Sequence, residues 1–147
     1  CLGFRGRVFA QSFVLGASSW YGATRLGTVE LLLDRPAEAL CAFDMALKTK
    51  PNEREARLGR AEALIQLGEA AAALRTIEGL LDDSSPDSWA LAASAVSVMR
   101  LPDDARLFSG RALALADKTF IAPHRRGMLR ELIASLRGRE AQIVSQG

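Results

Sequence analysis

The positions of small and large apolar residues repeat along this chain of 147 residues, and the repeat constrains the fold more than any other feature. Gly27 recurs as Ala61 after 34 residues and as Ala93 after a further 32. The same two offsets relate two more sets of positions, which are Ala39, Ala73 and Ala105, and Leu47, Leu81 and Leu113. One pair of offsets thus serves positions throughout the unit, so each unit is expected to pack as its neighbours do.

Each repeat reads as two amphipathic helices joined by a turn. In the first repeat an apolar stripe covers 20–34, and Pro36 opens a second helix that runs to about 48 before Pro51 ends it. The helices of the later repeats are expected over 56–68, 70–82, 89–99 and 103–116. An aromatic content of only 6% and many Ala and Leu residues also favour helix over strand. We therefore predict an all-α fold, an α-solenoid of antiparallel helix pairs.

Two further helices are expected outside the three repeats. Phe9 and Phe13 mark a helix over 5–15 that would be the second helix of a preceding repeat, and a helix from Pro123 to about 140 would cap the stack. The apolar surface left by the missing partner of the 5–15 helix predicts self-association through that helix. The expected plan is a single domain with a partial repeat at 1–19, repeats at 20–53, 54–85 and 86–117, and a capping helix and tail at 118–147.

With 34 residues in each unit of helix, turn and helix, residues 20–117 resemble the tetratricopeptide repeat (TPR) family. The first repeat carries the resemblance best, since the family's small, large and terminating positions are held there by Leu26, Gly27, Ala39, Phe43, Ala46 and Pro51. The chain departs from the family pattern at Ala23, where Trp is preferred, and at Glu30, where Tyr is preferred. The alternative is an unrelated helical bundle in which Ala and Leu repeat by chance, and the shared offsets argue against it.

The TPR resemblance implies a non-enzymatic module that binds a peptide in a concave groove lined by the first helix of each pair. The implied groove residues are Tyr21, Arg25, Thr28 and Leu32 in the first repeat, Glu55, Leu58, Glu62 and Gln66 in the second, and Asp87, Leu91, Ser94 and Val98 in the third. Tyr21 and Arg25 belong to the residue types enriched at binding hot spots. Glu55, Glu62 and Asp87 would favour a peptide with a basic portion, and charge reversal at Glu62 and Asp87 together is expected to leave the fold intact.

No catalytic, cofactor-binding or metal-binding motif is visible, so we expect no enzyme activity, no cofactor, no metal and no small-molecule substrate. The sole histidine, His124, lies in a basic run, which predicts a solvated surface residue. The isolated Cys1 and Cys41 predict neither a disulfide framework nor a C-x-x-C pair. A net charge of +2 argues against a nucleic-acid partner, and the basic excess after Lys118 fits either a solvated cap or an acidic partner.

Two interpretations of function stay open. The first is a cytoplasmic scaffold that binds a protein or peptide partner. The second is a regulatory or targeting TPR domain of a larger enzyme, or of an envelope-assembly protein whose signal sequence was removed. An envelope-assembly protein would lie in the periplasm or envelope. The uncharged run over 8–24 is diluted by Ser, Gln and Gly, so no membrane span is predicted. The bias toward Ala, Arg and Leu favours a bacterial protein.

Overall fold

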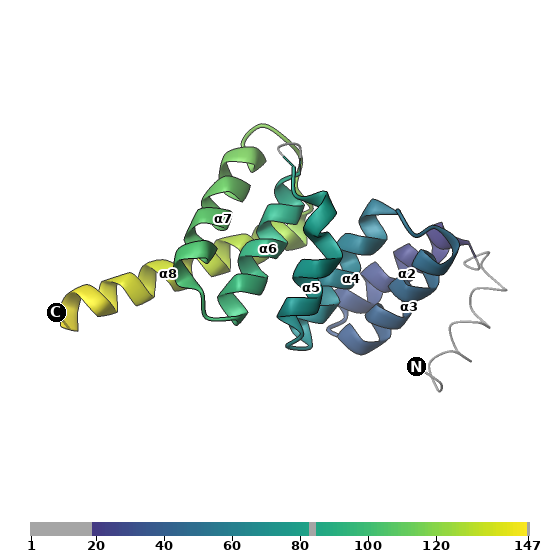
Figure 1. Cartoon of the computed structure of the whole chain (residues 1–147), viewed down its shortest axis with the longest axis horizontal. Helices are drawn as coiled ribbons and strands as arrows, with labels where there is room; N and C mark the ends of the chain where they lie inside the picture. Colours follow the sequence, from purple (N-terminus) through teal and green to yellow (C-terminus); the bar gives the residue numbers. More distant parts are fainter. Residues whose placement is uncertain (1–18, 83–84, 147) are drawn as a thin grey trace. The chain divides into compact units, whose positions relative to one another are not determined.

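The computed structural model describes residues 19–82 and 85–146, and every regular element in these ranges is a helix (Figure 1). The elements are α2 (Trp20–Leu32), α3 (Pro36–Thr49), α4 (Arg54–Gln66), α5 (Ala70–Ile77), the 3₁₀ helix η1 (Glu78–Leu80), α6 (Pro86–Val98), α7 (Pro102–Ala116) and α8 (Pro123–Gln146). The order of helix pairs confirms the all-α prediction. The helix expected over 5–15, and the self-association expected from it, lie outside the described residues.

The boundaries of three helices differ from the expected ones. The helix expected over 70–82 ends at Ile77 and continues as η1, a tightening that is common at helix C-termini. Helix α6 begins at Pro86 and not at 89, because Ser85 caps it: the Ser85 Oγ accepts from the Ser88 backbone N–H at 3.4 Å, and Pro86 suits the first turn. The last helix runs six residues beyond the expected end, to Gln146.

The turn inside each helix pair repeats with the same 34- and 32-residue offsets, at Asp34, Gly68 and Arg100. All three residues have positive φ, of 59°, 83° and 63° respectively. In each turn the backbone N–H of the following residue donates to a carbonyl in the last turn of the first helix, at 2.8 to 2.9 Å. This is the closing bond of a Schellman motif, and it turns the chain into the second helix. Only Gly68 is the residue type that this backbone conformation favours.

The chain forms two compact units, one that ends at Ile77 and one that begins at Glu78. In the first unit α3 packs against both α2 and α4, and α5 packs against α4. The centre of its core is Phe43, which is fully buried, with Ala39 and Ala46 on either side of it along α3. The Arg60 guanidinium of α4 joins three helices, since it donates to Asp44 Oδ1 in α3 and to Thr76 Oγ1 in α5, both at 2.7 Å.

In the second unit α6 and α7 form a hairpin, and α8 packs against both helices (Figure 1). The core of this unit contains Ala90, Ala112, Ile121 and Leu129. The expected cap is therefore present as α8. The single domain expected from the sequence stays a prediction.

Burial of the repeated small residues follows the sequence pattern. The side chains of Ala39, Ala46, Ala73 and Ala105 are fully buried, which confirms that these positions lie at close helix contacts. Cys41 is also buried, as expected for a small core residue. Cys1 lies outside the described residues.

Candidate peptide-binding cleft

A cleft of about 470 Å³ lies between the outer face of α2 and the start of α4, within the first unit. Its lining residues are Trp20, Tyr21, Thr24, Arg25, Thr28, Val29, Leu32, Glu53 and Glu55. Five of the groove residues implied by the TPR resemblance are among them: Tyr21, Arg25, Thr28, Leu32 and Glu55. The structure therefore brings together the predicted residues of the first repeat and one residue of the second.

The periodicity of α2 explains why these side chains share a face. Tyr21, Arg25, Thr28 and Leu32 follow one another at spacings of four, three and four residues, which places them on one stripe of the helix. The opposite stripe packs against α3 through residues that include Ala23 and Leu31. Tyr21 keeps 56% of its surface exposed and Leu32 keeps 63%. The cleft thus presents large side chains that are more than half exposed.

Two aromatic rings lie between two cationic side chains along one wall of the cleft. The Lys50 Nζ lies 4.1 Å from the centroid of the Trp20 ring, and the Trp20 ring meets Tyr21 edge to face at 5.8 Å. The Arg25 guanidinium donates to the Tyr21 hydroxyl at 3.2 Å and lies over the same ring. Cation–π contacts at exposed sites contribute roughly 0.5–1 kcal/mol each, so they restrict these long side chains without burying them. The wall is partly ordered before any ligand arrives.

The polar groups in the cleft differ in their availability to a ligand. The hydroxyls of Thr24 and Thr28 donate to the carbonyls of Trp20 and Thr24, at 2.7 and 3.1 Å, so these threonines offer methyl groups and acceptor lone pairs. The Glu53 carboxylate lies 3.4 Å from the Lys50 Nζ. Glu55 is exposed at the first turn of α4. The cleft therefore has a cationic wall at Arg25 and an acidic wall at Glu53 and Glu55.

The remaining predicted groove residues lie elsewhere. Leu58, Glu62 and Leu91 are 2%, 4% and 0% exposed, so their side chains belong to the packed interior and present almost no surface to a ligand. Ser94 is half-buried, whereas Gln66 and Val98 are exposed. None of these six residues lines the cleft described above.

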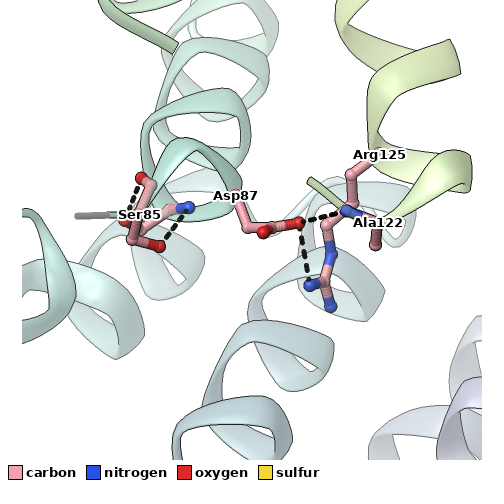
Figure 2. A network of polar contacts seen from close by, with 5 residues as sticks. Ser85, Asp87, Ala122 and Arg125 are labelled. Atoms are coloured by element: carbon pink, nitrogen blue, oxygen red, sulfur yellow. Dashed lines mark hydrogen bonds and ion pairs between the residues drawn. The ribbon is translucent and has the colours of Figure 1, made fainter. Parts of the chain in front are cut away.

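Asp87, the last of the seven groove candidates that lie outside the cleft, is engaged in a contact within the second unit (Figure 2). Its Oδ1 accepts from the Ala122 backbone N–H at 3.2 Å and from the Arg125 Nη1 at 3.3 Å. Arg125 is only 3% exposed, so it does not belong to the solvated basic face expected for the last helix. The pair fastens the start of α8 to the start of α6. With Glu62 buried and Asp87 paired, we now expect charge reversal at both positions to disrupt the fold.

Thr24 lies in the cleft beside the predicted residues of α2, and sequence reasoning missed three other residues. Trp20 and Val29 flank the stripe on α2, and Glu53 precedes the first turn of α4. A signal for Trp20 was present, because Trp, like Tyr, is a residue type enriched at binding hot spots, and Trp20 directly precedes Tyr21. His124, expected to be solvated, is half-buried in the first turn of α8.

Comparison with known proteins decides the family. A family model described as tetratricopeptide repeat matches residues 18–95. The chain belongs to the tetratricopeptide repeat family. The NMR structure of the first TPR domain of the human RPAP3 protein is similar to it, with a TM-score of 0.64 and 18% sequence identity over 83% of this chain and 95% of that chain. At that identity the likeness supports the TPR fold alone. No curated protein matches the sequence.

TPR domains are in general non-catalytic modules for protein interaction, and this fold suggests the same for the present chain. In the part of the chain that the structure describes, no three His, Cys, Asp or Glu side chains are grouped closely enough to hold a metal ion. None of the described helices combines the length and the apolar character needed to cross a bilayer.

Proposed function

We propose that this TPR domain binds an extended segment of a partner protein in the cleft between α2 and the start of α4. The observation that carries the proposal is the convergence of exposed apolar and charged side chains on one hollow of about 470 Å³. Binding pockets are commonly concave and mostly apolar, with a few polar groups that fix the orientation of the ligand. The cleft has both parts, an apolar floor and two charged walls.

The side chains suggest the chemistry of the segment. Val29 and Leu32 would contact an apolar anchor residue, and Tyr21 offers a large rigid contact surface with a polar tip. Arg25 would favour an acidic or polar residue of the ligand on one side, and Glu55 a basic residue on the other. An alternating segment with one central apolar anchor therefore fits better than a uniformly acidic or basic one. The same cleft would serve a free-standing scaffold or a targeting domain of a larger protein.

The test is selection of binding peptides from a random library displayed on phage, followed by affinity measurement against variants. Leu32→Glu should weaken the binding of a selected peptide by at least tenfold, because it places a charge against the apolar anchor residue of the peptide. Leu107→Glu is the matched control, since Leu107 is exposed to a similar extent but lies in α7 of the other unit. Selected peptides that bind both variants as tightly as the wild type would place the binding site outside this cleft.

A further inference from the structure

A second groove, of about 240 Å³, lies between α7 and α8 and is independent of the cleft on α2. It is lined by Arg106, Ser109, Gly110, Leu113, Ile133, Leu136 and Arg137. Its position at α7 and α8 places it wholly in the second unit. None of these residues was assigned to a site from the sequence.

The groove exists because α7 has a small residue at its centre. A Cβ at Gly110 would meet no other heavy atom within 4 Å, so the backbone of α7 is open to the surface there. Leu113, one turn further along, keeps 45% of its surface exposed, and Leu136 of α8 is buried beneath. The Ser109 hydroxyl donates to the Arg106 carbonyl at 3.1 Å, so it does not demand a polar partner. The floor of the groove is therefore apolar.

The charged side chains that line the groove are both cations. Arg137 is exposed on α8, and Arg106 lies on α7 with its Nη1 2.8 Å from the Oδ1 of the solvated Asp103. Arg126 and Arg130 are also exposed and lie on the same face of α8 as Arg137, since they precede it by eleven and seven residues. Glu131 is about 140° around the helix from Arg126, on a different face. Arg137 therefore makes the α8 side of the groove positive, and Arg130 and Arg126 extend this positive face toward the start of α8.

We infer that the groove between α7 and α8 docks an acidic amphipathic helix of a partner protein. Helices commonly bind to an apolar groove through one face, with anchor side chains at three- and four-residue spacing. The apolar floor formed by Leu113, Ile133 and Leu136 would receive those anchors. Carboxylates on the flanks of the docked helix would meet Arg137, Arg130 and Arg126 along the positive face of α8. Residues 1–18 of this chain carry two Arg and no Asp or Glu, so their charge does not suit this groove.

The experiment uses the full chain and a fluorescein-labelled synthetic helix with leucines at i, i+3, i+4 and i+7 and glutamates at the flanking positions. A twin peptide carries lysines in place of the glutamates. Fluorescence anisotropy should show saturable binding of the acidic helix and at least tenfold weaker binding of its basic twin. The affinity for the acidic helix should fall as salt is raised.

Variants then locate the binding surface. Arg137→Glu should weaken the binding of the acidic helix by about tenfold. The matched control is Arg75→Glu, which makes the same change of charge at an exposed position of α5 and should leave the affinity unchanged. Gly110→Phe should abolish binding by filling the groove, and Leu113→Glu should do so by removing the apolar floor. Circular dichroism confirms that each variant stays helical.

Three results would overturn the assignment. The first is no saturable binding of the acidic helix, or equal binding of its basic twin. The second is binding that is unaffected by Arg137→Glu and by both groove variants, or that is lost instead on Leu32→Glu in the α2 cleft. The third is sedimentation showing a dimer of the chain that Gly110→Phe dissociates, which would make a second copy the occupant of the groove.

Discussion

Gly59→Ala tests the packing at the centre of the first unit. The fully buried Phe43 ring of α3 lies between Gly27 of α2 and Gly59 of α4. A Cβ built at Gly27 would lie 2.7 Å from the Cε1 and Cζ atoms of the ring, and a Cβ at Gly59 would lie closer still to Cζ. Such approaches are shorter than real carbon contacts, so either substitution must displace the ring. The two glycines therefore set the distances at which α2 and α4 pack on α3.

The expected loss of stability follows from two opposing terms. Overpacking a close-packed core destabilises it by about 1–3 kcal/mol, occasionally more. Alanine in a helix interior returns about 0.8–1.0 kcal/mol of helix propensity relative to glycine. Because the Phe43 ring is enclosed on all sides, Gly59→Ala belongs at the upper end of the first range, and we expect a net loss of about 2 kcal/mol. Gly27→Ala should show a smaller loss.

Urea unfolding followed by circular dichroism measures the effect. The matched control is Gly110→Ala, whose new Cβ meets no atom within 4 Å and which should stabilise α7 by up to about 1 kcal/mol through helix propensity alone. Adding Phe43→Leu to Gly59→Ala should recover part of the loss, with a coupling energy on the order of 1 kcal/mol. If Gly59→Ala stabilises the protein as Gly110→Ala does, the Phe43 ring does not lie between the two helices.

Four further substitutions test the turns and the buried polar groups. Arg100→Gly should stabilise the α6–α7 turn by about 0.5–1 kcal/mol, because Arg100 has positive φ, which glycine adopts without strain. Gly68→Ala should destabilise the equivalent turn by a similar amount for the same reason. Thermal melts measure both, and shifts of the melting temperature in the same direction would contradict the prediction. Asp87→Ala should destabilise the second unit by on the order of 3 kcal/mol, since it removes the carboxylate partner of the buried Arg125; a urea midpoint within error of the wild type would contradict this. Glu30→Leu should stabilise the first unit by about 1 kcal/mol, because the buried Glu30 Oε2 lacks a hydrogen-bond partner; a lower melting temperature would instead show that the carboxylate is needed.

The repeat offsets predict the helix pairs because close helix contacts require small residues wherever backbones approach. Ala39, Ala73 and Ala105 are fully buried for that reason, and the period even extends to the turn residues Asp34, Gly68 and Arg100. The offsets also explain why Glu30 is unusual. Its equivalents after 34 and 32 residues are Leu64 and Val96, which are buried apolar residues. A carboxylate that lies 3.7 Å from the Arg35 guanidinium therefore occupies a core position.

The same pattern could not predict which of the groove carboxylates remain available to a ligand. Glu55, Glu62 and Asp87 occupy comparable faces of their helices, yet Glu55 is exposed, Glu62 is buried, and Asp87 bonds to the chain 35 and 38 residues further on. Helical periodicity specifies the face on which a side chain lies but not what the following helix places against that face. The chain between α7 and α8 brings Arg125 to Asp87 (Figure 2). These connecting residues have no equivalent in the other repeats, so the sequence pattern could not predict the contact. A charge on the expected face is therefore a candidate for binding only when its side chain stays exposed, as those of Glu55 and Arg25 do, whereas Asp87 is held by Ala122 and Arg125.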